Sequence, residues 1–377
     1  MKREVDNVKK SGSMDFGMFV IIMILLCIGL VMVASASSYH ALIYYGDSNH
    51  LFIRQLIFAG VGVAAMFVIS NIDYKKYKKW GYLAFILAAI LLLLVITPLG
   101  VTRNGAKRWL GVGEVLQFQP SEIMKPVLAI AVATYLSRNV KKLNTIKGYI
   151  VPIIMVLIVV LLMYLQKHMS GMLVLIVSGV SVIFASGIKL KVKTILAGIL
   201  IIGMVGAAFV LAEDFRLQRI FSFMNPEEDI QDGNWQAAQS LYAIGSGGLL
   251  GRGLGQSRQK YLWLPEAQND FIFSILGEEM GFLGTGIVLG LFAFFIYKGY
   301  MIAITCKDFY GSLIVSGIMS VFAVQIIINV AVVTCSMPVT GMPLPFFSYG
   351  GTSLLINLYS MGVVLNISKN CNKIKEQ

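Results

Sequence analysis

Asp270 is the residue whose position points most clearly to chemistry. It closes the polar stretch 264–270, which also contains Pro265 and Glu266, and a long apolar run begins directly after it. A carboxylate at the edge of a membrane-spanning segment is costly, and such residues are usually retained for a function. We therefore expect a functional carboxylate where an external loop meets a membrane helix.

A second set of ionisable and aromatic residues lies in the segment 104–125. Glu122 and Lys125 stand three positions apart, so they share one face of a helix and can pair within the membrane. The pair could simply orient the helix, or Lys125 could face a cavity and meet an anionic group. Trp109 could contact a ligand or anchor the chain at the membrane interface. The spacing alone leaves these alternatives open.

Two segments rich in glycine or proline are expected to shape the surroundings of these residues. Six glycines fall between 245 and 255 without the preceding strand or the Gly-Lys-Ser/Thr of a phosphate loop, so they predict tight turns or close backbone contacts. Three of the nine prolines fall within 338–345, where no regular helix can continue. Irregular backbone at membrane depth needs protein or water to satisfy its polar groups, so this segment predicts a cavity wall.

The elements that position these residues are predicted to be membrane helices. The sequence is 57% hydrophobic and 13% charged, with a mean hydropathy of +0.77, which is outside the range of soluble globular domains. Apolar runs near the roughly 20 residues that span a bilayer lie at 15–37, 51–71, 79–98, 121–137, 149–165, 170–188, 194–212, 270–297, 310–334 and 346–367. The predicted fold is an all-α polytopic membrane protein of about ten transmembrane helices. In the eighth, Gly277 with Gly281 and Gly286 with Gly290 predict helix packing.

The distribution of basic residues predicts the orientation of the chain. With the N-terminus inside, 20 of the 31 Lys and Arg residues fall in cytoplasmic segments, as the positive-inside rule requires. Residues 1–377 then form one integral membrane domain with a cytoplasmic N-terminal segment (1–14), a large extracytoplasmic loop between spans seven and eight (213–269) and a cytoplasmic tail (368–377). The net charge of +12 is dispersed among loops, so it indicates topology and a lipid surface, not nucleic acid.

The four cysteines give no sign of a covalent or metal-bound framework. Cys27, Cys306, Cys335 and Cys371 lie in different predicted segments, and the sequence has no Cys-x-x-Cys motif or Cys/His cluster. We therefore expect neither a disulfide nor a zinc site. A divalent cation such as Mg²⁺ or Mn²⁺ held by one carboxylate and a ligand would leave little trace in residue spacing, so metal ligands stay unknown.

Several motifs, in order along the chain, resemble the SEDS family (shape, elongation, division and sporulation), which includes RodA, FtsW and SpoVE branches. The resemblance rests on residues 104–110, 119–125, 239–255, 264–279 and 343–353. It implies a SEDS-type, GT-C-like membrane architecture over essentially the whole chain. Residues 29–38 and 339–341 look more like the FtsW and SpoVE branch than the RodA branch.

The resemblance also implies an activity. Members of this family are peptidoglycan glycosyltransferases that polymerise lipid II outside the cytoplasmic membrane, usually with a class B penicillin-binding transpeptidase and among other divisome or elongasome membrane proteins. Asp270 matches the essential aspartate of the family motif Pro-Glu-x-x-x-Asp-Phe and is expected to be the general base. The reaction converts an α-linked donor into a β-1,4 bond. Such an inversion needs a single displacement and one base, unlike the paired carboxylates of most glycosidases.

The resemblance further suggests which residues contact the substrate. The residues expected to bind it are Lys125, Glu122, Trp109, Arg108, Arg252, Lys260, Glu266 and Ser348. The four basic residues among them would supply countercharge to a departing pyrophosphate, with a divalent cation as a further candidate. One departure lies at 166–170, where many members read Gln-Pro-Asp-x-Gly and this chain reads Gln-Lys-His-Met-Ser. A carboxylate role is not expected there, and His168 could form a hydrogen bond to the ligand or be structural.

Two other functions fit a protein of this kind. A lipid II flippase would place polar and charged groups throughout the bilayer, whereas the ionisable residues within the predicted spans cluster toward the outer face. A non-catalytic scaffold for the transpeptidase is the other alternative, and the intact Asp270 motif argues against it as the sole role. Division, sporulation and elongation are not distinguished, because all would use the same reaction.

Overall fold

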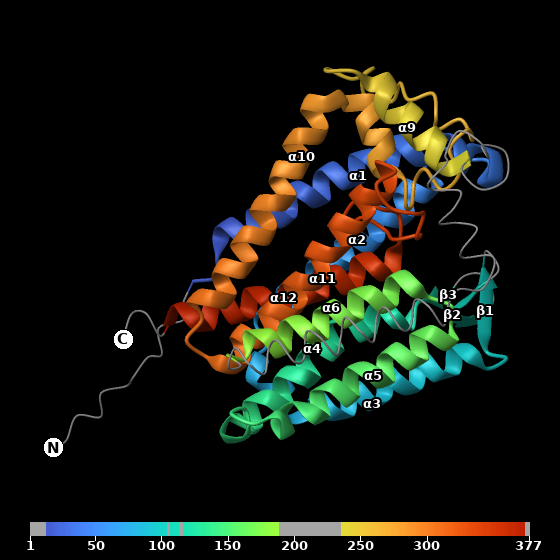
Figure 1. The fold of residues 1–377 in the computed structure, drawn as a ribbon. Helices are drawn as coiled ribbons and strands as arrows, with labels where there is room; N and C mark the ends of the chain where they lie inside the picture. The colour runs from blue at the N-terminus through green and yellow to red at the C-terminus, as the bar shows by residue number, and fades with distance from the viewer. Residues whose placement is uncertain (1–12, 104–105, 113–115, 188–234, 374–377) are drawn as a thin grey trace.

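The protein folds as a bundle of helices with a small sheet at one end (Figure 1). This computed structural model describes residues 13–103, 106–112, 116–187 and 235–373. The helices are α1 (Phe16–Tyr45), α2 (His50–Ser70), α3 (Tyr77–Ile96), α4 (Pro120–Arg138), α5 (Ile150–Leu165), α6 (Met169–Ala185), α9 (Trp235–Gly247), α10 (Ile272–Thr305), α11 (Phe309–Val333) and α12 (Gly351–Lys373). Short 3-10 turns, η1 (Tyr74–Lys76), η2 (Val140–Lys142) and η3 (Ile146–Tyr149), lie in the connections.

Within the described part of the chain, seven helices are long and apolar enough to cross a membrane. They are α1, α2, α3, α5, α10, α11 and α12. The apolar helix α6 is shorter, at 17 residues, and α4 carries Glu122 and Lys125 in its first turns. The predicted helical membrane fold is confirmed, and a helix occupies every predicted span that falls within the described residues. The span 194–212 lies outside them, so the count of ten stays a prediction.

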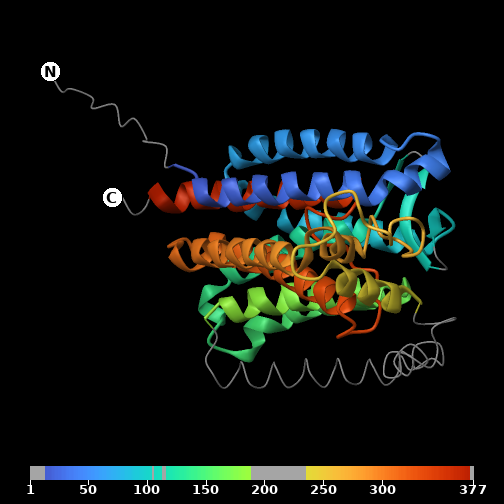
Figure 2. The ribbon, with the colours of Figure 1, turned by 90° about the horizontal axis from the view of Figure 1, so that it is seen from above.

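The most enclosed of the candidate membrane spans is α11. Its apolar window is 78% buried, whereas the windows of α2 and α3 are 22% and 28% buried. It packs against α4, α6, α10 and α12. Seen from above in Figure 2, the helices run alongside one another, and the sheet lies at the end of the bundle away from the C-terminal end of α12. The exposed side chains of α2 and α3 are largely aliphatic, as expected for helices that face lipid. Polar groups on α11 are therefore remote from lipid.

A three-stranded antiparallel sheet was not part of the helical prediction. Strands β1 (Gly100–Arg103), β2 (Ala106–Val112) and β3 (Leu116–Phe118) are paired in the order β1-β2-β3, between α3 and α4. Trp109 pairs with Val101, and Leu110 pairs with Phe118. These strands are too short to give a clear alternation of polar and apolar residues, which is why the sequence did not indicate them. The sheet places Arg108 and Trp109 close to the start of α4.

The loop predicted at 213–269 contains a helix in its described part. This helix is α9, and the residues before it, 213–234, lie outside the description. The hydroxyl of Ser240 on α9 lies 2.7 Å from Ser274 Oγ on α10 and 2.6 Å from the Val333 carbonyl oxygen on α11. The segment after α9 is thereby fixed to the bundle. At the C-terminal end, α12 continues through Lys373, so the residues predicted as a tail from 368 onward begin inside a helix.

Of the α10 glycines predicted to pack against a helix, Gly277 does so, because a Cβ there would lie 3.1 Å from Ile244 of α9. Gly281 has φ +64° and ψ −166°, a conformation suited to glycine, and it kinks the helix. A Cβ on Gly281 would lie only 2.3 Å from the Gly251 nitrogen, so no larger residue fits there. The kink frees N–H groups of α10, and carbonyls of the loop after α9 accept them: Phe282 N donates to Gly248 O at 2.9 Å. Gly286 and Gly290 have no neighbour within 4 Å of an added Cβ among the described residues, so the packing predicted for this pair stays a prediction.

A disulfide joins Cys306, at the end of α10, to Cys371 near the end of α12. The prediction that no disulfide occurs is therefore wrong. Its two cysteines are 65 residues apart and belong to no spacing motif, so no local pattern indicated their pairing. The bond ties together two helix ends on the side of the bundle opposite the sheet.

Candidate active site

Asp270 lies in a tight turn that immediately precedes α10. The turn is closed by hydrogen bonds from Asn269 N and Phe271 N to the Glu266 carbonyl, at 3.0 and 3.4 Å. Glu266 itself has φ +56°, an uncommon conformation for a residue other than glycine. Helix α10 begins at Ile272, two residues later than predicted, so Asp270 sits just outside the spanning helix. Such strained backbone tends to occur at functional sites.

Three consecutive carbonyls of this turn are hydrogen-bonded to other elements. Gln268 O accepts from Tyr349 N at 2.9 Å, and Asn269 O accepts from Ser348 Oγ at 2.7 Å. Asp270 O accepts from Asn329 Nδ2 of α11, also at 2.7 Å. The backbone of the turn is thus fixed by the broken segment near 340–350 and by the central helix.

The proline-rich segment has irregular backbone whose polar groups are satisfied by protein. The Ser348 hydroxyl also accepts from Leu344 N at 2.7 Å. Gln55 of α2 donates to Ser348 O at 3.2 Å and accepts from Gly350 N at 3.1 Å. A Cβ on Gly341 would lie 3.4 Å from Asp270 Oδ2, so this segment forms a wall beside the carboxylate. The Ser348 hydroxyl, predicted to bind substrate, is used in these backbone contacts.

The environment of Asp270 favours its protonated form. Burial is the largest cause, and the negative charge of Glu266 adds to it, while the positive charge of Arg108 acts in the opposite direction. Together these raise the pKa of Asp270 from 3.8 to about 7. A carboxylate with such a pKa can take up a proton near neutral pH, which is what a general base requires.

Glu122 and Lys125 form the ion pair that their spacing predicts. Lys125 Nζ lies 2.5 Å from Glu122 Oε1, and both side chains are buried. Ser353 Oγ of α12 donates to Glu122 Oε2 at 3.0 Å. Lys125 also lines a small cavity with residues of α4, α11 and α12, namely Pro126, Ile318, Val321, Phe322, Ile356, Asn357 and Ser360. The ion pair therefore occurs and Lys125 also borders a cavity, while a contact between Lys125 and an anionic ligand group stays a prediction.

Arg108 and His168 lie between the sheet and the start of α6. Arg108 Nη2 donates to Lys167 O at 2.8 Å, and the positive charges of Arg108 and Lys125 both act on His168. Burial, with these charges, lowers the pKa of His168 to about 3, so the ring is neutral. Its Nδ1 accepts from Gly171 N at 3.0 Å and caps α6, and its Nε2 lies 2.9 Å from the side-chain amide of Gln119. The ring is therefore committed to structural contacts.

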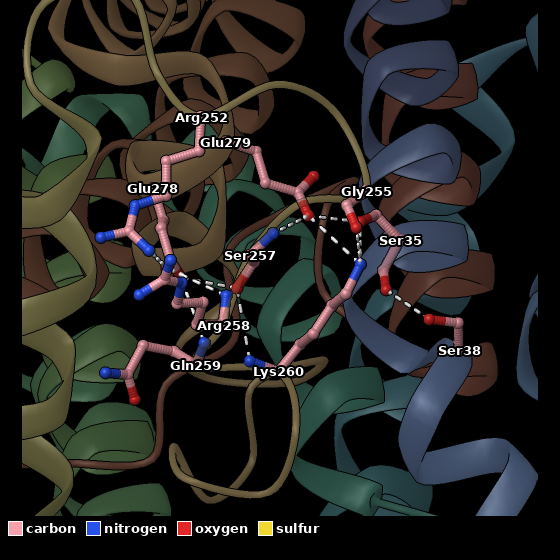
Figure 3. Close-up of polar contacts among 10 residues, drawn as sticks. All are labelled: Ser35, Ser38, Arg252, Gly255, Ser257, Arg258, Gln259, Lys260, Glu278 and Glu279. Carbon is pink, nitrogen blue, oxygen red and sulfur yellow. Dashed lines mark hydrogen bonds and ion pairs between the residues drawn. The ribbon is translucent and has the colours of Figure 1, made fainter.

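Arg252 and Lys260 belong to a second cluster of charged residues, shown in Figure 3, in which Lys260 is buried and Arg252 is exposed. Lys260 Nζ lies 2.6 Å from Gly255 O and 3.6 Å from Glu279 Oε1, and Ser35 Oγ of α1 donates to the same Glu279 oxygen at 2.6 Å. Arg252 Nη1 lies 3.5 Å from Glu278 Oε1. Both basic residues thus have carboxylate partners and fix the loop that follows α9 to α1 and α10.

The structure brings together most, but not all, of the residues that the sequence singled out. Asp270, Glu266 and Arg108 interact electrostatically, and Arg108 and Lys125 both act on His168. The sequence reasoning missed the residues that position them, Asn329, Gln55, Ser353 and Gln119. Polar residues inside the apolar runs of α2 and α11 were the available signal for Gln55 and Asn329, because such residues are costly in a membrane. In the described part of the chain, no group of three or more His, Cys, Asp or Glu residues could hold a metal.

The fold and this site define a multi-pass membrane protein with a partly buried carboxylate at one end of its helix bundle. The chain belongs to the FtsW/RodA/SpoVE family of cell cycle proteins, which matches residues 16–373. It is 42% identical over 362 residues to stage V sporulation protein E of Bacillus subtilis, covering 96% of this chain and 98% of that protein. It is 38% identical over 360 residues to the probable peptidoglycan glycosyltransferase FtsW of Trichlorobacter lovleyi, covering 94% and 93%. Among solved structures, a chain from a peptidoglycan synthase complex is similar, with a TM-score of 0.78, 26% identity and coverage of 95% of this chain and 98% of that chain.

Proposed function

We propose that this chain is a peptidoglycan glycosyltransferase that polymerises lipid II into β-1,4 glycan strands at the outer face of the bacterial cytoplasmic membrane, with Asp270 as the general base. The observation that carries the proposal is the partly buried carboxylate of Asp270, whose pKa of about 7 is matched to proton transfer at neutral pH. The name of one sequence relative, a probable peptidoglycan glycosyltransferase FtsW, supports the same class of activity.

The reaction requires one base and one displacement. The 4-hydroxyl of an acceptor GlcNAc gives its proton to Asp270 while its oxygen attacks the anomeric carbon of a donor MurNAc. The bond from that carbon to undecaprenyl pyrophosphate breaks, and the electron pair leaves with the pyrophosphate. Attack from the opposite face converts the α-linkage into a β-linkage. A well-placed base contributes about 10²–10⁴-fold, so alignment and charge stabilisation supply the rest.

The leaving pyrophosphate needs positive charge nearby. Arg108 and Lys125 are the basic residues that this site offers, because Arg108 acts on Asp270 and both act on His168. The carboxylates of Glu266 and Asp270 repel each other, and a divalent cation such as Mg²⁺ or Mn²⁺ shared with the pyrophosphate would relieve that repulsion. When bound, such an ion would neutralise charge on the leaving group. Arg252 and Lys260 are assigned a positioning role, since their charges are paired with Glu278 and Glu279.

The cellular setting follows from the same proposal. Both termini face the cytoplasm, according to the distribution of Lys and Arg, which places the Asp270 end of the bundle outside. The partner is a class B penicillin-binding transpeptidase, within a division or sporulation machinery. The similarity to a chain of a peptidoglycan synthase complex supports a partner of this kind.

The test is polymerisation of lipid II by the purified chain reconstituted with its transpeptidase partner. Glycan ladders from wild-type protein and none from Asp270→Asn are expected, with moenomycin present to suppress contaminating class A polymerases. Chelation of divalent cations with EDTA, followed by addition of Mg²⁺ or Mn²⁺, tests the cation. Ladders of equal yield from Asp270→Asn would contradict the role of Asp270. No ladders from either folded protein would favour transport or scaffolding, and a lipid II translocation assay would then separate those two.

A further inference from the structure

Asn329 makes the side-chain contact that connects the Asp270 turn to the centre of the bundle. It lies on α11, the most enclosed of the candidate membrane spans, and is 1% exposed. Its Nδ2 donates to two carbonyls, Asp270 O and Met342 O, each at 2.7 Å. The two bonds join Asp270, which carries the carboxylate, to Met342. The residue before Met342 is Gly341, where an added Cβ would lie 3.4 Å from Asp270 Oδ2.

The chemistry of the two partners settles the orientation of this amide. Both are carbonyl oxygens, which only accept, so the nitrogen of Asn329 and not its oxygen must face them. The Oδ1 atom is buried without a hydrogen-bond partner among the described residues. The side chain thus leaves one polar atom unsatisfied in order to bridge the two carbonyls. An unsatisfied buried polar atom has a cost, so the bridge has to offset it.

Of the three hydrogen bonds that fix the turn, only the bond from Asn329 is made to Asp270 itself. The bonds from Tyr349 N and Ser348 Oγ are made to Gln268 and Asn269. The direction of a side chain follows from the geometry of its own backbone, so the peptide of Asp270 determines where its carboxylate points. Fixing that peptide to Met342 also fixes the carboxylate relative to the Gly341 wall.

We propose that Asn329 is a positioning residue for catalysis: its amide bridges Asp270 O and Met342 O and thereby holds the carboxylate of Asp270 at the place where it meets the acceptor hydroxyl. The proposal rests on the proposed role of Asp270 as general base. A displacement of about 1 Å can cost on the order of 100-fold in rate. Loss of the bridge should therefore lower turnover without removing any group that contacts the substrate.

Two variants and a matched control test this role. Asn329→Leu has a similar size and removes both hydrogen bonds, and Asn329→Asp has the same shape but cannot donate when ionised. Asn366 of α12 serves as the control because it also bridges backbone groups, accepting from Tyr74 N at 2.9 Å and donating to Ser70 O at 2.7 Å, and is 3% exposed. It lies at the other end of the bundle, so Asn366→Leu removes an equivalent bridge far from Asp270.

Kinetics of lipid II polymerisation with the transpeptidase partner, normalised to folded protein, provide the readout. We expect both Asn329 variants to lower kcat about 100-fold while KM for lipid II is unchanged. The midpoint of the acidic limb of the pH profile should move down in Asn329→Leu, as the loosened turn admits water, and up in Asn329→Asp, where a negative charge is added. Asn366→Leu should lower the yield of folded protein but leave kcat and the midpoint unchanged.

The other outcomes overturn the inference in distinguishable ways. Asn329 variants with the kcat and pH midpoint of the wild type would exclude a positioning role, even if Asp270→Asn is inactive. Asn329 would be purely structural if Asn366→Leu lowered kcat equally. The same would follow if both Asn329 variants failed to fold while Asn366→Leu folded. An active Asp270→Asn would instead contradict the proposed function.

Discussion

Two clusters of charged residues lie next to each other at the start of α10, and they are built in opposite ways. In the cluster around Glu278 and Glu279, the carboxylates themselves are bound. Glu278 accepts from Ser257 Oγ at 2.6 Å and Arg258 N at 3.0 Å, and Glu279 accepts from Ser35 Oγ at 2.6 Å. At Asp270 the backbone is bound instead. Among the described residues, none donates a hydrogen bond to its carboxylate or forms a salt bridge with it.

This difference in hydrogen bonding distinguishes charged groups that stabilise the fold from a carboxylate that is available for reaction. A buried carboxylate with donors and a cation nearby is stabilised as an ion, and it fixes the segments that supply those partners. A buried carboxylate beside another negative charge is destabilised as an ion and becomes more basic. Asp270 is of the second kind, because burial and Glu266 raise its pKa to about 7. Proximity to α10 alone would not have distinguished the two.

The largest expected effect comes from removing the available charge. Asp270→Asn should lower kcat by about 10²–10⁴-fold, the usual contribution of a general base. The substitution should not destabilise the fold. The pKa of Asp270 is 3.8 in the unfolded protein and about 7 in the folded protein, so the stability that its carboxyl group contributes is present below pH 4 and is lost as the pH rises through 7. The neutral amide avoids that loss. Thermal unfolding in detergent should therefore give a Tm equal to or above that of the wild type at pH 8.

The matched substitution in the other cluster is Glu278→Gln. It should lower Tm, since the carboxylate that binds Ser257, Arg258 and Arg252 is lost, and have a smaller effect on kcat per folded molecule. Similar kcat losses for Asp270→Asn and Glu278→Gln would remove the distinction between the clusters.

Breaking an ion pair in the structural cluster should be the next largest effect. Lys260→Met leaves Glu279 buried without its cation, at 3.6 Å in the native protein, and should lower the free energy of unfolding by about 3–5 kcal/mol. Adding Glu279→Gln removes the unpaired charge and should restore much of that loss. Lys298→Met is the control, because its 2.9 Å pair with Asp15 is partly exposed and should be worth at most about 1 kcal/mol. Denaturant unfolding of the four proteins measures these differences, and equal losses at Lys260 and Lys298 would refute the expectation.

A smaller effect should appear in the pH profile of polymerisation. Glu266→Gln removes a negative charge that raises the pKa of Asp270, so the midpoint of the acidic limb should move to lower pH. Arg108→Gln removes an opposing positive charge and should move it to higher pH. Each unit of pKa changes the rate at a fixed acidic pH about tenfold. Two variants that move the midpoint in the same direction would show that these charges do not set the basicity of Asp270.

The sequence was informative where a single residue or run has a large cost. Apolar runs predicted the membrane helices, and the cost of charge in a membrane drew attention to Asp270 and to the Glu122–Lys125 pair. It was uninformative about partners that depend on folding. The bridge made by Asn329 and the disulfide between Cys306 and Cys371 join residues far apart in the chain, and no local pattern encodes such pairs. The roles of Arg252 and Lys260 changed for the same reason, since their carboxylate partners became known only in the structure.

The smallest effect concerns the wall beside the reactive carboxylate. Gly341 has φ +67°, and a Cβ there would lie 3.4 Å from Asp270 Oδ2. Gly341→Ala should cost about 1–2 kcal/mol of stability, because a side chain is disfavoured in the left-handed region. Its methyl group should also displace water from the carboxylate and move the acidic limb of the pH profile to higher pH. Gly286→Ala is the control, since no described residue lies within 4 Å of a Cβ at that position of α10, and alanine there should be neutral or slightly stabilising. A lowered Tm without a shift in the midpoint would mean that the Gly341 wall supports the fold but does not set the basicity of Asp270. The contrast between the two clusters would then rest on Glu266, Arg108 and the other surroundings of Asp270.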